Sequence, residues 1–230
     1  MDFDFSPYFK KYEELVAVAE DAFNRVKGDH PDCVKCELGC ADCCHALFDL
    51  TLIEALYVNH KFKAAFEGAQ RETMLERANR SDRQTYQIKK RAGKMMKEGS
   101  TDEEILERVA AESVRCALLN DENLCDLYDF RPITCRLYGV PTAIGGKGHT
   151  CGLSAFAPGE SYPTANLDRI QAALTALSKA LVADLKSKYL TLGEILVPLS
   201  SALLTDYDET YLGLKTEDAG QTDGTENKHE

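Results

Sequence analysis

The sequence shows neither a signal-peptide pattern nor a stretch that could cross a membrane. Residues 1–5, MDFDF, are acidic and lack the basic start and continuous apolar run of a secretory signal. Nowhere does the chain approach the roughly eighteen consecutive apolar residues that a transmembrane helix needs. We therefore expect a cytoplasmic protein without membrane contact, in a compartment where glutathione and thioredoxin keep thiols reduced.

Positive charge is also scarce, because the 230 residues carry a formal net charge of −11 and the isoelectric point is near 5.0. Such a chain repels the phosphate backbone, which excludes nucleic-acid binding as its general role. One segment departs from this balance, since residues 71–98 hold nine Lys or Arg against four Asp or Glu. It predicts either an ordinary solvated helix face or, at 71–97, a docking surface for a protein substrate or an acidic partner.

The chain lacks the sequence signatures of several enzyme classes. No G-x-G-x-x-G motif stands at a strand-to-helix turn, and the glycine-rich stretch 145–148 lies in a predicted loop. No acid–base pair or nucleophile stands out, and no series of barrel strands is evident. These absences favour a binding role but leave open whether the protein is an enzyme.

Helical periodicity dominates what is present. Capping signals and apolar residues at three-and-four spacing predict helices at 6–28, 51–66, 70–98, 100–110 and 166–186, and a last helix that begins at the 191–194 capping box. The sequence thus predicts a mainly α fold in one domain over 1–214, whose helical C-terminal part spans 165–205. Residues 215–230 carry no large apolar side chain and predict a disordered acidic tail.

The pattern becomes irregular between these helices. Apolar runs at 114–119 and 124–128 flank turn-forming residues and predict a small β-hairpin at about 115–128. The dipeptide Arg131-Pro132 predicts the start of a short helix. Glycines and prolines in 141–164 predict an ordered loop.

Cysteines are the strongest signal in the chain, which has nine of them: Cys33, Cys36, Cys40, Cys43, Cys44, Cys116, Cys125, Cys135 and Cys151. In a reducing compartment this number predicts metal ligation or redox chemistry rather than a disulfide frame. The pairs Cys33/Cys36 and Cys40/Cys43 are Cys-x-x-Cys units, in which a turn brings two thiolates to one ion. A continuous helix over 33–44 would spread the thiols too far for one metal atom, so we expect Gly39 to break it.

Adjacent Cys43 and Cys44 have diverging side chains, so we expect only one of them in a given coordination sphere. The other could ligate a second centre or be buried as a small hydrophobe. The four later cysteines form a looser set, which we expect to face the 33–44 segment across a shared metal centre. His45 and His149 could be additional ligands or ordinary histidines.

Three stretches together resemble a known family: "CELGCADCC" at 36–44, the helix start at 50–54, and "RCALLNDENLCDLYDFRPITCRLYG" at 115–139. They are similar to the YkgJ-like cysteine-cluster family, CxxCxxCC, described as a zinc- or iron-chelating domain and related to flagellin lysine N-methylases. The resemblance covers about 33–155 and departs from the family pattern at His45, where Arg or a similar residue is usual. It implies a compact helical domain organised around a cysteine-ligated metal centre.

Two kinds of centre fit the cysteine inventory. Zinc needs four tetrahedral ligands per structural site, and eight cysteines could supply two such sites. A 4Fe–4S cluster needs four thiolates, which could come from Cys36, Cys40, one of Cys43/Cys44 and a later cysteine. The resemblance to methylases linked to such a cluster favours iron–sulfur over zinc.

Two functions are compatible with the sequence. The first is a metal-binding or accessory module, in which metal alone explains the cysteines. The alternative, implied by the resemblance, is a cluster-dependent protein lysine N-methyltransferase that uses S-adenosylmethionine. The sequence identifies no catalytic residue, but Tyr128, Arg131 and Arg136 are either structural or close to the thiolates, where a guanidinium stabilises an anionic cluster.

Overall fold

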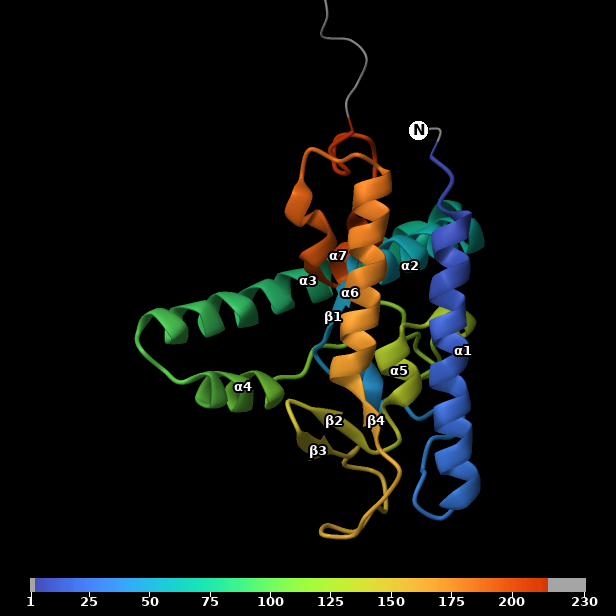
Figure 1. The fold of residues 1–230 in the computed structure, drawn as a ribbon, viewed down its shortest axis with the longest axis vertical. Helices are drawn as coiled ribbons and strands as arrows, with labels where there is room; N and C mark the ends of the chain where they lie inside the picture. The colour runs from blue at the N-terminus through green and yellow to red at the C-terminus, as the bar shows by residue number, and fades with distance from the viewer. Residues whose placement is uncertain (1–2, 215–230) are drawn as a thin grey trace, which may run out of the picture.

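The computed structural model describes residues 3–214 (Figure 1). Its helices are α1 (Ser6–Asp29), α2 (Leu52–Ala65), α3 (Gly68–Lys97), α4 (Asp102–Ala110), α5 (Ile133–Leu137), α6 (Leu167–Asp184) and α7 (Leu199–Leu204), and its 3-10 turns are η1 (Asp42–His45), η2 (Tyr128–Phe130) and η3 (Leu190–Glu194). Its short strands are β1 (Asp49–Thr51), β2 (Thr142–Ile144), β3 (Lys147–His149), β4 (Ala165–Asn166) and β5 (Leu196–Pro198). The predicted mainly helical fold is confirmed, and the predicted acidic tail, 215–230, lies outside the described residues.

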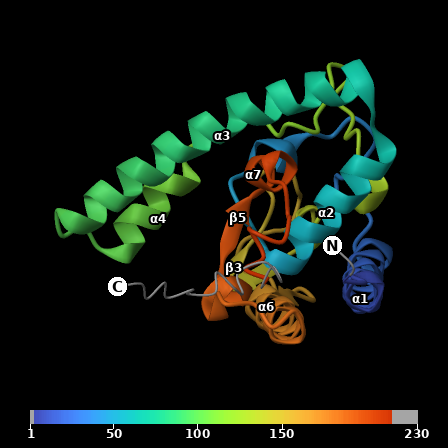
Figure 2. The same ribbon diagram turned by 90° about the horizontal axis from the view of Figure 1, so that it is seen from above.

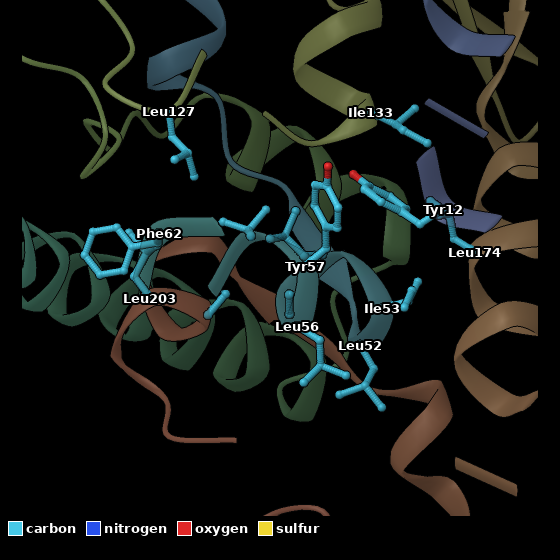
Figure 3. Close-up of a cluster of buried hydrophobic side chains, with 14 of the residues drawn as sticks. Tyr12, Leu52, Ile53, Leu56, Tyr57, Phe62, Leu127, Ile133, Leu174 and Leu203 are labelled. Atoms are coloured by element: carbon cyan, nitrogen blue, oxygen red, sulfur yellow. The ribbon is translucent and has the colours of Figure 1, made fainter. Parts of the chain in front are cut away.

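Helix α2 forms the centre of the hydrophobic core. Apolar residues lie all round it, which is typical of a buried helix, and Ile53, Val58 and Phe62 have no exposed surface. Helices α1, α6 and α7 pack against it, and Figure 1 shows α1 and α6 running lengthwise beside each other. In Figure 3 the rings of Tyr12 from α1 and Tyr57 from α2 face one another, with centroids 4.8 Å apart.

Two small sheets complete the core. Strand β1 pairs antiparallel with β5, with Leu50 opposite Val197, so the residues just before α2 are fixed against a segment near the C-terminal end of the described chain. The second sheet has the order β3-β2-β4, antiparallel between β2 and β3 and parallel between β2 and β4. No helix between residues 3 and 214 combines the length with the apolar character that a bilayer span requires.

Helix α3 is a single 30-residue helix that spans the width of the molecule, with α4 folded back against it (Figure 2). Several basic residues of 71–97 are bonded to acidic residues elsewhere: Arg77 to Asp126 at 3.4 Å, Lys89 to Asp49 at 2.6 Å, and Arg91 to Glu112 at 2.7 Å. Part of the positive charge therefore fixes the helix to the rest of the chain. Docking of an acidic partner on this helix stays a prediction.

The predicted hairpin at 115–128 is present in a short form. Leu119 and Cys125 form an antiparallel bridge, the Asn120 N–H donates to the Leu124 carbonyl at 2.9 Å, and the Asp126 N–H donates to the Leu118 carbonyl at 2.8 Å. The Asn120 side chain accepts the backbone N–H groups of Glu122 and Leu124 in the turn. The regular hairpin is β2–β3, inside the segment 141–164 that was predicted as a loop.

The predicted start of the last helix is wrong. Residues 190–194 form the 3-10 turn η3, and β5 follows it as an extended strand. Helix α7 begins only at Leu199, directly after Pro198. Proline has no backbone N–H and is tolerated at a helix start but not in its interior, so the capping box at 191–194 cannot open a helix that runs through this position.

Candidate metal centre

A cavity of about 560 Å³ lies between the early cysteine segment and the later cysteine-bearing loops. Eight of the nine cysteines, all of them in the described part of the chain, line this cavity: Cys36, Cys40, Cys43, Cys44, Cys116, Cys125, Cys135 and Cys151. The two cysteine sets therefore line one cavity, and a metal centre shared between them stays a prediction. Cys33 does not line the cavity, and its carbonyl accepts a hydrogen bond from the Ala155 N–H at 2.9 Å.

The early segment reaches the cavity through two turns rather than one helix, as predicted. Gly39 has φ of +87°, a left-handed conformation that glycine adopts without steric cost. After it, η1 presents both Cys43 and Cys44 to the same cavity. The two adjacent thiols thus share one cavity instead of facing separate environments.

Backbone hydrogen bonds join η1 to the segment that carries the next cysteine. The Cys116 N–H donates to the Cys44 carbonyl at 2.7 Å, and the Val114 N–H donates to the His45 carbonyl at 3.2 Å. Cys125 is held beside this segment by its antiparallel bridge to Leu119. Cysteines about seventy positions apart in sequence are therefore adjacent because their backbones are bonded.

Cys135 enters the cavity on the short helix α5, which begins after Pro132. The Ile133 N–H at the start of this helix donates to the Glu54 carboxylate at 3.3 Å, and Glu54 itself belongs to the capping box of α2. One buried carboxylate therefore fixes the starts of both helices.

The outermost cysteine, Cys151, is positioned by the early segment. Its thiol donates to a carboxylate oxygen of Asp42 at 3.3 Å, and its sulfur accepts the Leu153 N–H at 3.4 Å. The position of Cys36 depends on a glycine, because a Cβ at Gly139 would overlap the sulfur of Cys36. Only glycine therefore leaves room for that thiol at its present place.

Burial raises the pKa of several cavity thiols. The pKa of Cys36 rises to about 11, chiefly through burial and then through the nearby Cys40 and Cys151 thiols. Burial likewise raises the pKa of Cys116 to about 12 and that of Cys135 well above the ordinary value. These thiols are protonated near neutral pH, so a metal that binds them must displace their protons.

The adjacent thiols of η1 differ from the rest. The hydrogen bond from the Cys44 thiol lowers the pKa of Cys43 to about 7, and the Arg131 guanidinium acts in the same direction. The same bond raises the pKa of Cys44, which is the donor. The contacts of the pair therefore favour the anion of Cys43 over that of Cys44.

The thiol groups are distributed around the cavity and do not converge on the position of a single metal ion. Within residues 3–214 no group of three or more His, Cys, Asp or Glu side chains is gathered closely enough to hold one metal ion. His45 and His149, two candidate ligands, are not among the residues that line the cavity. Thiols are nevertheless the donors that zinc and iron–sulfur clusters prefer, so the chemistry of the donor set fits either centre.

Comparison with known proteins gives one result that covers the same residues. The model of the family "CxxCxxCC: Putative zinc- or iron-chelating domain" matches residues 33–152. The chain belongs to this family. No curated protein and no solved structure matches the chain. The family match establishes a cysteine-cluster domain of this description, whereas the relation to flagellin lysine N-methylases stays a prediction.

Three residues of the site were not identified from the sequence. Asp42 lies inside the cysteine motif, and Gly139 is the last residue of the stretch 115–139. Their positions close to cysteines in the sequence could have identified them as site residues. Glu54 was identified only as part of a capping box. Its bond to α5 joins segments about eighty positions apart, and no local pattern contains that contact.

Proposed function

We propose that this chain is a metal-binding protein whose cysteines hold an iron–sulfur cluster of the 4Fe–4S type, and that it acts as a binding or accessory module. The observation that carries the proposal is the set of eight cysteine side chains on one cavity. Mostly buried thiols with raised pKa values are costly as free anions, and a shared metal centre is the simplest way to offset their repulsion.

The spread of the thiols supports the iron–sulfur assignment over zinc. A Zn–S distance of about 2.3 Å in a tetrahedral site places neighbouring sulfurs roughly 3.8 Å apart. No three donors in residues 3–214 have the close arrangement that a single ion requires, whereas a polynuclear cluster spans a larger volume. Two four-thiolate zinc sites are the second assignment, because eight cysteines line the cavity.

We assign Cys36, Cys40 and Cys135 to the cluster, together with one of Cys43 and Cys44. The early cysteines belong to the matched family motif, and Cys135 reaches the same cavity from α5. Cys116, Cys125 and Cys151 are the further candidates. Cys33 lies outside the cavity and has the weakest claim.

A second candidate function is a cluster-dependent protein lysine N-methyltransferase that uses S-adenosylmethionine. The observation that favours it is the size of the cavity, about 560 Å³, which is within the range of about 300–1,000 Å³ for small-molecule pockets. Apolar side chains such as Leu38, Leu47 and Phe48 contribute to its lining. Calorimetric titration of S-adenosylmethionine into the metal-loaded protein tests this candidate, and no heat of binding would remove it.

The cysteine assignment is tested with a matched pair of variants. Cys135→Ser replaces a thiol of the cavity, and Cys33→Ser replaces one outside it. Purified without oxygen, the Cys135→Ser protein should lose most of the visible absorption and bound metal, while the Cys33→Ser protein should keep most of both. Equal metal content in the two variants, with unchanged circular dichroism, would contradict the assignment.

A further inference from the structure

Arg131 is an arginine whose hydrogen-bond donors are not used by the protein. In the described part of the chain its Nε and Nη1 atoms are buried and have no hydrogen-bond partner, and no ion pair to its guanidinium is found there. A buried charged donor without a partner destabilises the fold more than a neutral one does, because it has lost its hydration. Such a group calls for a partner that binds at this place.

The guanidinium of Arg131 packs by its face, beside the cysteine cavity and beside a second cavity that Glu13, Glu20 and Asp129 also line. Its face is stacked on the Tyr128 ring, with the guanidinium carbon 3.8 Å from the ring centroid. Stacking uses the face of the group and leaves its N–H donors, which lie in the plane, available. Both residues line the cysteine cavity.

The side chain of the neighbouring Arg136, in contrast to that of Arg131, has a partner at each of its three nitrogens. It donates to the Arg131 carbonyl at 3.0 Å and to the Asp129 carbonyl at 2.6 Å, and it forms an ion pair with Glu20. Arg136 therefore holds the backbone of the 129–131 loop in place. Its role is to position Arg131, whose own side chain stays unpaired within residues 3–214.

The positive charge of Arg131 acts on thiols from three different segments. Its positive charge lowers the pKa of Cys43 from η1, and it opposes the rise that burial causes in the pKa of Cys125 and Cys135. Four thiolates on a divalent ion or on a 4Fe–4S cluster leave a net negative charge in a partly buried site. A hydrogen-bonded cation beside such a centre offsets that charge.

We propose that Arg131 is the counter-ion of the metal–thiolate centre, with its free N–H groups donating to metal-bound sulfurs of Cys43, Cys125 or Cys135. The inference rests on the proposed function, because it requires that these cysteines bind metal. It assigns Arg131 a positioning and charge-compensating role. It also explains why the chain retains a buried guanidinium without a partner.

The test compares three variants of the full chain with Zn²⁺ as the probe, because Zn²⁺ with four thiolates carries the same kind of net negative charge. Arg131→Gln removes the charge, Arg131→Lys retains it without the planar fork, and Arg83→Gln removes an equal, exposed charge outside the cavity. Competition with a chromophoric chelator measures the affinity. We expect Arg131→Gln to bind about 10–100-fold more weakly, Arg131→Lys to recover part of the loss, and Arg83→Gln to match the unmodified protein.

Thermal unfolding of the metal-free proteins separates this role from a structural one. Removal of an unpartnered buried cation should leave the metal-free Arg131→Gln protein as stable as the unmodified one, or more stable. If that variant instead unfolds at a lower temperature without metal, Arg131 is structural and the inference is overturned. Unchanged Zn²⁺ affinity in Arg131→Gln would also overturn it, while the proposed function would stand as long as the unmodified chain binds metal. An unmodified chain that binds neither zinc nor iron would overturn both.

Discussion

At the scale of single residues, the cavity depends on a glycine as much as on its cysteines. Gly139 follows α5 and stands against Cys36, with no space for a Cβ between them. Its backbone conformation is not left-handed, so steric contact with the sulfur, and not backbone strain, requires glycine here. A substitution at Gly139 therefore changes the position of the Cys36 thiol and leaves the thiol itself in the chain.

We expect Gly139→Ala to displace the Cys36 thiol. The added methyl group must move a sulfur in a packed region, which generally costs about 1–3 kcal/mol, and the metal content should fall with it. Gly148→Ala is the control, because no atom lies within 4 Å of a Cβ at that position. Denaturant unfolding and metal analysis measure both effects. The account of Gly139 is wrong if the two variants have equal metal content and equal stability.

The sequence identifies the residues of the site better than their contacts. Cysteine has few roles in a reducing compartment, so nine cysteines in a 230-residue chain predict a metal site by their number alone. Arg131 could be either structural or close to the thiolates, because an arginine in sequence does not show whether its donors are paired. The stacking of its guanidinium on Tyr128 and its buried, unpartnered Nε and Nη1 atoms become visible only in the structure, where they depend on the η2 turn and on Arg136.

At the scale of elements, two helices begin with the same capping box but in different surroundings. Thr51 and Glu54 open α2 inside the core, where Glu54 is only 3% exposed, and Thr101 and Glu104 open α4 at the surface. In α2 the carboxylate also accepts the Ile133 N–H of α5. The buried box thus joins the core helix to the helix that carries Cys135.

We expect Glu54→Ala to lower the free energy of unfolding by about 2–4 kcal/mol, because it leaves buried N–H groups without an acceptor. The matched change Glu104→Ala should cost about 0.5–1 kcal/mol, since water can replace the lost acceptor. Urea unfolding of the metal-free proteins measures the difference. Similar losses in the two variants would show that Glu54 does no more than cap its own helix.

The same carboxylate predicts a dependence of stability on pH. Burial raises the pKa of Glu54, while hydrogen bonds from Ile133 and Thr51 oppose the rise. With a folded pKa above the unfolded one, its contribution is fully present below about pH 4.3 and is lost as the pH rises through the folded value. Glu54→Gln should remove this fall in the free energy of unfolding. As the pH rises, the stability of the Glu54→Gln protein should therefore increase relative to that of the unmodified protein.

A local sequence pattern predicts an element correctly where contacts within the segment determine its structure. It fails where contacts with distant segments determine that structure. The helices α1, α3 and α6 follow their predicted ranges closely, because amphipathic spacing and terminal signals lie within each segment. Residues 196–198 follow a capping box, yet they form a strand because β1 pairs with them across the core. The 115–128 hairpin is shorter than predicted, since the Cys116 N–H at its start donates to the Cys44 carbonyl and not to the opposite arm.

At the scale of the whole molecule, the metal site is assembled from segments that are far apart in the chain. The early turns, the 114–125 segment, α5 and the loop after β3 each supply cysteines to one cavity. Metal bound by all of them closes long loops, so its binding free energy contributes to folding. The family match covers this same assembly, residues 33–152, while α1, α6 and α7 support it from outside.

The most direct test of this account is the metal content of the chain, measured together with its absorption spectrum after purification without oxygen. The account predicts a brown protein with broad visible absorption and about four iron atoms and four sulfides per chain, as expected for one 4Fe–4S cluster. A colourless protein with stoichiometric zinc would contradict the iron–sulfur assignment and leave the cysteine site in place. A folded, colourless protein that holds neither metal would contradict the central claim that these cysteines form a metal centre.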